Sequence, residues 1–279
     1  MVPKRILAIH DLSGFGHTSL LAVIPIMYRM GIEVATMPTT LLSANTDFPG
    51  YRRQDNTAML KQVFEHWKEL ELRFDAVYTG FLGDPGQVEI ILEYLPEMLK
   101  PNAIVLVDPV LGDDGKLYSC FDDSVVHAMK NLVACSDIIT PNFTEAALLL
   151  GNQFNSSPES LLAWCKDLSK LGPKQIIITS APCESGDNSK LVHYSKGSAV
   201  VSEYECNYVP VSYPGAGDCF ASILLAALLN GNSLATAIKG SCEFIRHAFA
   251  ISLPIVEDRR TGIALAAALA KDPHSFFSE

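Results

Sequence analysis

The sequence lacks the features that mark several large classes of protein. Its net charge is -10 and it shows no basic stripe, which argues against nucleic acid as a partner. No internal repeat or low-complexity segment is present. The seven cysteines, at positions 120, 135, 165, 183, 206, 219 and 242, form no CxxC pair, and several fall inside apolar runs. We therefore expect buried free thiols in a reducing compartment.

The sequence also lacks a long apolar run near its start. The first such run, residues 6–9, is too short for a signal-peptide core or a membrane span, so we expect a cytoplasmic protein with no membrane partner. Apolar residues are nevertheless abundant, at 48% against 19% charged, which supplies a substantial core and excludes wholesale disorder. No linker-like segment divides the 279 residues, which predicts a single domain over residues 1–279.

Short apolar runs alternate with amphipathic stretches along the chain. They predict strands at 5–10, 33–37, 76–79, 104–108, 138–140 and 175–179, and helices near 18–30, 55–71, 86–99, 122–133, 143–150 and 158–171. Two further strands, 191–194 and 199–204, follow without an intervening helix, and helices near 233–250 and 258–270 complete the chain. This order predicts an α/β fold: a doubly wound, mostly parallel sheet flanked by helices on both faces, with an antiparallel edge.

Residues 214–218, Pro-Gly-Ala-Gly-Asp, open a long apolar helix. Small residues let the backbone approach a ligand closely, and the free N–H groups of a helix start favour an anion. Asp218 would repel that anion, so it is better explained as a base that takes a proton from a nucleophile beside it. The motif predicts phosphoryl transfer, with the backbone N–H groups of residues 216–218 holding the transferred group. The alternative is a tight glycine turn with an aspartate placed favourably near the helix start.

Acidic side chains follow two of the predicted strands. Asp108 ends one buried run, and Asp113 and Asp114 lie in the loop after it, where carboxylates would orient hydrated Mg²⁺ near phosphates. For Asp114 a plain turn is the better interpretation. After the next strand, Asn142 and Glu145 have the spacing of a capping box, and that structural role competes with a role for Glu145 in binding a metal-bound water.

Two polar loops are candidates for the substrate side. Gly14 and Gly16 resemble part of a dinucleotide fingerprint, but Ser19 stands where that fingerprint needs glycine or alanine, which disfavours hydride transfer. We expect this loop to cover a small organic substrate, with Asp11 accepting hydrogen bonds; the alternative is that Asp11 caps a turn. The loop at 43–51 carries two aromatic residues and would close over a flat ring, unless it is an ordinary surface connection.

These motifs, in this order, resemble the ribokinase-like superfamily and, within it, the pyridoxal kinase family. The segments that carry the resemblance are 43–46, 78–81, 107–113, 138–145, 177–180 and 215–218, and together they span nearly the whole chain. The resemblance implies transfer of the γ-phosphoryl group of ATP to the 5′-hydroxyl of pyridoxal, pyridoxine or pyridoxamine. It also implies Mg²⁺, allows a monovalent cation, and implies a homodimer.

The resemblance assigns roles to individual residues. Asp218 matches the base and Gly215, Ala216 and Gly217 the anion hole. The matched substrate contacts are Asp11, Ser43, Thr46, Phe81 and Asp218. The matched ATP contacts are Asp108, Thr140, Asn142, Glu145, Thr179, Ser180, Tyr204, Cys206, Gly215 and Gly217, and the matched cation contacts are Asp113, Thr140 and Glu145. The chain departs from many relatives at Asp11, where they have serine, and at Phe81, where they have tyrosine.

Other functions fit part of the pattern. A hydroxymethylpyrimidine kinase shares the fold and the alcohol acceptor, whereas a sugar kinase fits less well because the aromatic residues Phe48, Tyr51 and Phe81 suit a flat ring. A protein that binds a nucleotide or another ligand without turnover is the alternative from a different class. Asp218 argues against it, because binding alone requires no base.

Overall fold

The computed structural model describes residues 2–152, 161–182, 189–205 and 212–277. The chain forms two compact units, one made of Met1–Asn56 together with Asn207–Glu279 and the other of Thr57–Cys206. The first unit therefore combines two segments that lie far apart in the sequence. That residues 1–279 act as one domain stays a prediction.

In the first unit three strands lie side by side in the order β1 (Arg5–Ser13), β2 (Glu33–Leu42) and β3 (Arg53–Asp55). Strand β1 is parallel to β2, and β3 is antiparallel to β2. Residues 6–9 are completely buried, as expected for a continuous apolar strand. The β1–β2 register shifts between His10 and Leu12, and irregularities of this kind often re-aim side chains beside functional sites.

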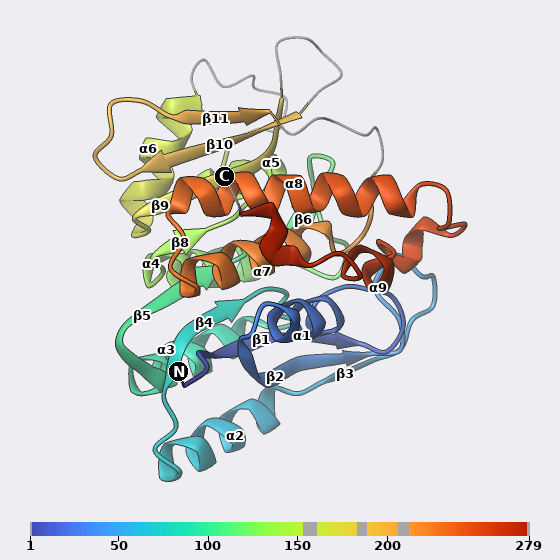
Figure 1. Ribbon diagram of the computed structural model, residues 1–279. Coiled ribbons are helices and arrows are strands. Elements are labelled where there is room, and N and C mark those ends of the chain that lie inside the picture. The colour runs from blue at the N-terminus through green and yellow to red at the C-terminus, as the bar shows by residue number, and fades with distance from the viewer. Residues whose placement is uncertain (1, 153–160, 183–188, 206–211, 278–279) are drawn as a thin grey trace. The chain divides into compact units, whose positions relative to one another are not determined.

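The helices of the first unit pack around α7. They are α1 (Leu20–Arg29), α7 (Ala216–Leu229), α8 (Leu234–Ser252) and α9 (Leu265–Ala268), with the 3₁₀ turns η1 (Arg259–Thr261) and η2 (Pro273–Phe276). Helix α7 contacts both α1 and α8, and α8 contacts α9 (Figure 1). Every residue from Cys219 to Ala227 is buried, because the sequence of α7 is apolar on all sides. The buried body of α7 therefore fixes the position of its first turn.

The prediction of one helix over residues 258–270 is wrong. The structure has only the short η1 and α9 there. Gly262 has φ 85°, which a continuing right-handed helix does not allow, and it separates the two pieces. The apolar spacing after Gly262 suggested a helix, but the backbone turn at this glycine outweighs it.

In the second unit the strand order is β11-β10-β9-β8-β5-β4. These strands are β4 (Phe74–Thr79), β5 (Leu99–Val107), β8 (Ile138–Ile139), β9 (Gln175–Pro182), β10 (Ser189–Ser195) and β11 (Ser202–Glu205). The first four are parallel, whereas β10 is antiparallel to β9 and β11 antiparallel to β10. The predicted antiparallel edge is confirmed.

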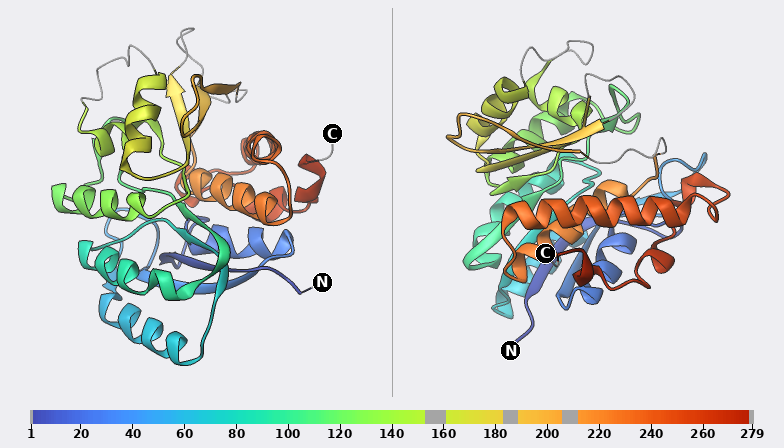
Figure 2. Two further views of the ribbon diagram at one scale, coloured as in Figure 1. Left: turned by 90° about the vertical axis from the view of Figure 1, so that its left-hand side faces the viewer. Right: turned by 45° about the horizontal axis from the view of Figure 1, so that its top comes forward.

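Five helices accompany these strands: α2 (Thr57–Glu69), α3 (Pro85–Met98), α4 (Asp123–Ala134), α5 (Phe143–Leu150) and α6 (Leu161–Leu171). Consecutive members contact one another, and Figure 2 shows them stacked as a layer beside the strands of this unit. The connections from β4 to β5, from β5 to β8 and from β8 to β9 each contain a helix that returns the chain, so the carboxyl ends of β4, β5, β8 and β9 share one edge of the sheet.

A small hairpin that the sequence did not predict follows β5. Its strands are β6 (Gly112–Asp113) and β7 (Lys116–Leu117), joined by Asp114 and Gly115, which both have positive φ. An Asp-Gly pair suits such a tight hairpin turn. The interpretation of Asp114 as a turn residue is confirmed.

The cysteines behave partly as expected. Cys165 and Cys219 are buried thiols and Cys135 is exposed, while Cys183 and Cys206 lie outside the described residues. Burial raises the pKa of Cys165 to about 12, which keeps that thiol protonated and unreactive. None of the helices in the described ranges is both long and apolar enough to cross a lipid bilayer.

Candidate active site

At the turn into α7, the backbone at Gly215 lies very close to the backbone at His17. Gly215 has φ 81°, and a Cβ atom there would lie 2.2 Å from the carbonyl oxygen of His17. Only glycine fits this position. Helix α7 begins directly afterwards, and the N–H groups of Gly217 and Asp218 hydrogen-bond to no part of the chain that the structure describes. The helix start therefore offers the free donors that an anion site needs.

Asp218 lies against the loop that follows β1. The Ser19 N–H donates a 2.8 Å hydrogen bond to Asp218 Oδ2, and His10 Nδ1 lies 3.7 Å from Asp218 Oδ1. The Asp218 side chain keeps 12% of its surface exposed, whereas the His10 side chain is fully buried. Asp218 is thus held in place at Oδ2 and has Oδ1 available for chemistry. The sequence did not predict this role of Ser19, because no motif marks its backbone as a partner of a residue 199 positions away.

Asp11 is a buried carboxylate, with only 3% of its surface exposed. Ser13 Oγ donates to Asp11 Oδ2 at 2.9 Å, and Ser19 Oγ donates to Asp11 Oδ1. Burial raises the pKa of Asp11 to about 6; the hydrogen bond from Ser19 opposes this rise, and the charge of Asp218 adds to it. Asp11 thus accepts hydrogen bonds from two hydroxyls of the chain itself. Direct contact with a substrate stays a prediction.

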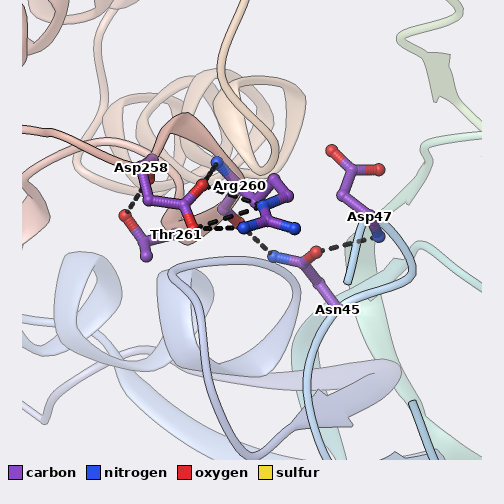
Figure 3. A network of polar contacts seen from close by, with 5 residues as sticks. All are labelled: Asn45, Asp47, Asp258, Arg260 and Thr261. Atoms are coloured by element: carbon purple, nitrogen blue, oxygen red, sulfur yellow. Dashed lines mark hydrogen bonds and ion pairs between the residues drawn. The ribbon is translucent and has the colours of Figure 1, made fainter. Parts of the chain in front are cut away.

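The loop at 43–51 is tied to the segment around η1. Asn45 Nδ2 donates to the Arg260 carbonyl at 2.7 Å and Asn45 Oδ1 accepts from the Asp47 N–H at 3.1 Å, so that Asn45 bridges the two segments (Figure 3). The Arg260 guanidinium lies 4.8 Å from the centre of the Phe48 ring and also pairs with Asp258. These contacts fix one conformation of the loop.

The predicted substrate contacts on this loop, Ser43 and Thr46, are exposed. Ser43 Oγ accepts a 2.8 Å hydrogen bond from the Arg52 N–H, which helps to close the loop. Phe48 makes an edge contact with Phe15 at 5.5 Å between ring centres, so both loops that were predicted for the substrate side meet there. Asn45 and Arg260 were missed, because their pairing depends on segments more than 200 residues apart.

In the second unit Glu145 lies at the start of α5, 4% exposed. It forms a capping box with Asn142: Glu145 Oε2 accepts from the Asn142 N–H at 2.7 Å, and Asn142 Oδ1 accepts from the Glu145 N–H at 2.8 Å. Glu145 Oε1 accepts from the Leu111 N–H at 3.2 Å. The capping interpretation is therefore confirmed, and a metal-binding role for Glu145 stays a prediction.

Three acidic side chains gather around this cap. Burial raises the pKa of Glu145 well above its usual range, and the neighbouring charges of Asp108 and Asp113 raise it further. Such mutual repulsion is relieved by a cation or by a proton. Within the described ranges, no three or more His, Cys, Asp or Glu side chains form a ready-made metal site. A cation site at this place stays a prediction.

Two threonines at strand ends have buried hydroxyls that find no partner in the described part of the chain. Thr79 Oγ1 ends β4 and Thr140 Oγ1 follows β8; both are buried, and neither makes a hydrogen bond within the described chain. Buried hydroxyls normally have partners, so these two are suited to a ligand. The Thr179 N–H bonds to the Pro141 carbonyl at 2.9 Å, which joins the ends of β8 and β9.

The remaining predicted nucleotide contacts are less constrained. Ser180 is exposed and has φ 55°, an uncommon conformation for a residue with a side chain. Tyr204 is half-buried on β11. Cys206 lies outside the described residues. The roles of all three in ATP binding stay predictions.

Phe81 is part of an aromatic cluster that the sequence did not reveal. Its ring stacks on Phe121 with 5.1 Å between centres, and Tyr118 lies 6.4 Å from Phe121. All three side chains are half-buried, so they present flat apolar surface near the carboxyl ends of β4 and β5. Phe121 and Tyr118 were missed because they lie in a loop without periodicity.

Comparison with known proteins gives consistent results. The family model for phosphomethylpyrimidine kinase matches residues 24–261. A crystal structure from Bacteroides thetaiotaomicron, assigned as a phosphomethylpyrimidine kinase and determined with pyridoxal, is 37% identical, with a TM-score of 0.92 and coverage of 99% of this chain and 96% of that one. Pyridoxal kinase from Lactobacillus plantarum is 32% identical, with a TM-score of 0.87 and coverage of 97% and 98%.

Human pyridoxal kinase is 29% identical over 237 residues, which cover 78% of this chain and 75% of the human protein. The solved relatives share the α/β, ribokinase-like fold with its mostly parallel sheet, so the fold class expected from the sequence is confirmed. The chain belongs to the pyridoxal kinase and phosphomethylpyrimidine kinase family.

Proposed function

We propose that this protein is a pyridoxal kinase, which transfers the γ-phosphoryl group of ATP to the 5′-hydroxyl of pyridoxal, pyridoxine or pyridoxamine. The observation that carries the proposal is the first turn of α7. There the Asp218 carboxylate lies in the same turn as the backbone N–H groups of Gly217 and Asp218, which have no partner in the described chain. A base beside an anion site is what phosphoryl transfer to an alcohol requires. Relatives named pyridoxal kinase, and a relative determined with pyridoxal, support the acceptor.

Asp218 acts as the base in this proposal. The Ser19 N–H occupies Oδ2 at 2.8 Å, so Oδ1 is the atom that takes the proton from the 5′-hydroxyl. The oxygen of the acceptor then attacks the γ-phosphorus as the bond to the ADP oxygen breaks. The N–H groups of Gly217 and Asp218 bind the transferred group, with the backbone shaped by Gly215 and Ala216. Because these donors are fixed before the reaction, they stabilise charge without reorganisation.

The second unit supplies the nucleotide and cation contacts. We assign Asp108, Thr140, Asn142, Thr179, Ser180 and Tyr204 to ATP and Asp113, Thr140 and Glu145 to Mg²⁺. The donor set fits Mg²⁺, since it consists of carboxylate and hydroxyl oxygens and includes Thr140 Oγ1, which is buried and has no hydrogen-bond partner among the described residues. When bound, Mg²⁺ neutralises phosphate charge. Asn142 holds Glu145 in place through the capping box.

A flat aromatic acceptor suits the aromatic groups that each unit carries by itself. Phe81, stacked on Phe121, offers one apolar surface, and Phe48 with Phe15 offers another on the loop at 43–51. Aromatic rings pack on one another with favourable offset or edge contacts. A sugar would leave this apolar surface unused.

A phosphomethylpyrimidine kinase is the second candidate. The family model that matches residues 24–261 carries that description, and hydroxymethylpyrimidine also presents a hydroxymethyl group on a flat ring. Asp218 and the anion site would serve either acceptor equally.

The test is an ATP-consumption screen of the purified protein with pyridoxal, pyridoxine, pyridoxamine, hydroxymethylpyrimidine and ribose, each with Mg²⁺. We expect the highest kcat/KM with one of the three B6 vitamers and phosphorylation at the 5′-oxygen by mass spectrometry and NMR. A higher kcat/KM with hydroxymethylpyrimidine would transfer the assignment to the second candidate. Absence of turnover with every acceptor would contradict both.

A further inference from the structure

Ser19 connects the two carboxylates of the first unit through different atoms. Its hydroxyl donates to Asp11 Oδ1, and its backbone N–H donates to Asp218 Oδ2 at 2.8 Å. Ser19 is 6% exposed and Asp11 3% exposed, so water does not compete strongly for these bonds. The result is a hydrogen-bonded chain, Asp11–Ser19–Asp218, that joins the end of β1 to the start of α7.

The backbone of Ser19 has a conformation that residues with side chains rarely adopt. Its φ is 49° and its ψ is -129°, a combination that costs a non-glycine residue free energy. This conformation aims the Ser19 N–H at Asp218 instead of along α1. Contacts with neighbouring groups must hold Ser19 in this conformation, because a free peptide would relax to an ordinary one.

The hydroxyl of Ser19 is used in an unusual way. Ser19 occupies the N-cap position of α1, where a serine side chain normally accepts a hydrogen bond from the backbone of the first helical turn. Here the side chain makes no cap bond and donates to Asp11 instead. At neutral pH Asp11 is ionised, since its pKa is about 6, and a carboxylate is a strong acceptor for a hydroxyl. The bond to Asp11 replaces the helix cap.

We propose that Ser19 and Asp11 are positioning residues for the base: Asp11 anchors the Ser19 hydroxyl, which holds the Ser19 backbone in the conformation that presents its N–H to Asp218. This inference rests on the proposed function of Asp218. It assigns Asp11 a role through Ser19 in addition to any contact with the acceptor. The role of Ser19 is to orient Asp218 so that Oδ1 faces the reacting hydroxyl.

Glycine and alanine at position 19 give opposite expectations. Glycine adopts the observed φ and ψ without an anchor, whereas alanine loses the anchor and keeps the steric penalty. We expect Ser19→Ala to lower kcat by roughly 10- to 100-fold, with KM for ATP and for the acceptor unchanged, because a small misplacement of a catalytic group has effects of this size. We expect Ser19→Gly to retain most of the parental kcat.

Asp11 gives an independent test of the same chain of contacts. We expect Asp11→Ala to lower kcat about as much as Ser19→Ala, and Asp11→Ala combined with Ser19→Gly to restore part of the loss, because glycine needs no anchor. Ser13→Ala is the matched control. Ser13 also donates to Asp11 and is completely buried, but the structure gives it no bond to Asp218. Its loss should change the melting temperature and leave kcat close to the parental value.

The measurements are steady-state kinetics with the best acceptor from the screen, and thermal melting of each variant. Equal kcat values for Ser19→Ala and Ser19→Gly, or a loss in Ser13→Ala as large as in Ser19→Ala, would overturn the inference. If Ser19→Ala does not fold, the comparison of Asp11→Ala with the double variant decides in the same way. Asp218→Asn separates the two proposals: retained activity there contradicts the proposed base, whereas inactivity together with equal Ser19 variants contradicts this inference alone.

Discussion

At the scale of single residues, the proposed phosphoryl transfer depends on Asp218 as the base that takes the proton from the acceptor. Asp218 Oδ1 makes no hydrogen bond within the described chain, and His10 Nδ1 lies 3.7 Å from it. The Cys219 thiol beside it is fully buried, and burial raises its pKa well above the usual range. Asp218 is therefore the group that we expect to control the rate of transfer.

Replacing Asp218 with asparagine preserves its shape and its bond from Ser19 but removes the base. We expect kcat to fall by about 10²- to 10⁴-fold while ATP still binds. Steady-state kinetics and calorimetric titration with ATP measure the two effects. Asp123→Asn is the matched control, since Asp123 is also in the first turn of a helix, α4, and is exposed. Near-parental turnover in Asp218→Asn would refute the assignment of the base.

Asp11 makes the stability of the protein depend on pH. Its pKa is about 6 in the folded protein and about 3.9 in an unfolded chain, so the folded state binds more protons between these values. Stability from this group is therefore greatest at low pH, and is lost as the pH rises from about 4 to about 6. Above that range the buried charge is a constant penalty.

Asp11→Asn removes that penalty while keeping a polar partner for Ser13 and Ser19. We expect the free energy of unfolding to rise by about 2–3 kcal/mol near neutral pH, and the difference from the parent to shrink toward pH 4. Denaturant unfolding at several pH values measures it, with the exposed Asp123→Asn as control. A difference that grows toward low pH would be the wrong sign and would refute the account.

At the scale of elements, helices with strong apolar periods and strands with continuous apolar runs were predictable. Helix α7 begins one residue after Gly215, and α5 begins after the Asn142 cap, as the sequence indicated. Several short elements were not predicted: β3, β6 and β7 have two or three residues each, and the helix expected over 258–270 is interrupted at Gly262. The two-residue strand β8 was predicted, because it is part of an apolar run. The conformation of the elements that were not predicted depends on contacts with distant segments more than on local propensity.

The loop at 43–51 shows this dependence, because Asn45 ties it to η1. Asn45 is 6% exposed and bonds to both Arg260 and Asp47, so Asn45→Ala leaves buried polar groups unpaired at a cost of about 1–3 kcal/mol. We expect faster amide exchange across residues 43–51 and a raised KM for the acceptor, with KM for ATP unchanged. Hydrogen exchange and kinetics measure these effects.

Asn232→Ala is the control for that prediction. Asn232 is half-buried and its Nδ2 donates to the Ala227 carbonyl at 3.0 Å, a bond of the same kind at the end of α7. Its loss should lower stability without changing KM for the acceptor. An unchanged acceptor KM in Asn45→Ala would separate the loop from substrate binding.

At the scale of the whole molecule, the two compact units raise the question of whether they unfold together in one cooperative transition. Both tryptophans, Trp67 and Trp164, lie in the second unit, so tryptophan fluorescence reports on that unit, whereas far-ultraviolet circular dichroism reports on all helices. If residues 1–279 act as one domain, the two signals should give the same midpoint in denaturant. Separate midpoints would show two domains. Light scattering on the same samples tests the expected homodimer.

The sequence by itself determined the alternation of strands and helices, the glycine turn into α7 and the polar residues at strand ends, because these follow from local periodicity and backbone freedom. Only the tertiary structure decided that Ser19 binds Asp218, that Asn45 binds the Arg260 carbonyl and that Glu145 gives both oxygens to backbone donors. The first two join residues about 200 positions apart, and no local pattern encodes such pairs. They arise when packing brings β1 to the start of α7 and the loop at 43–51 to η1.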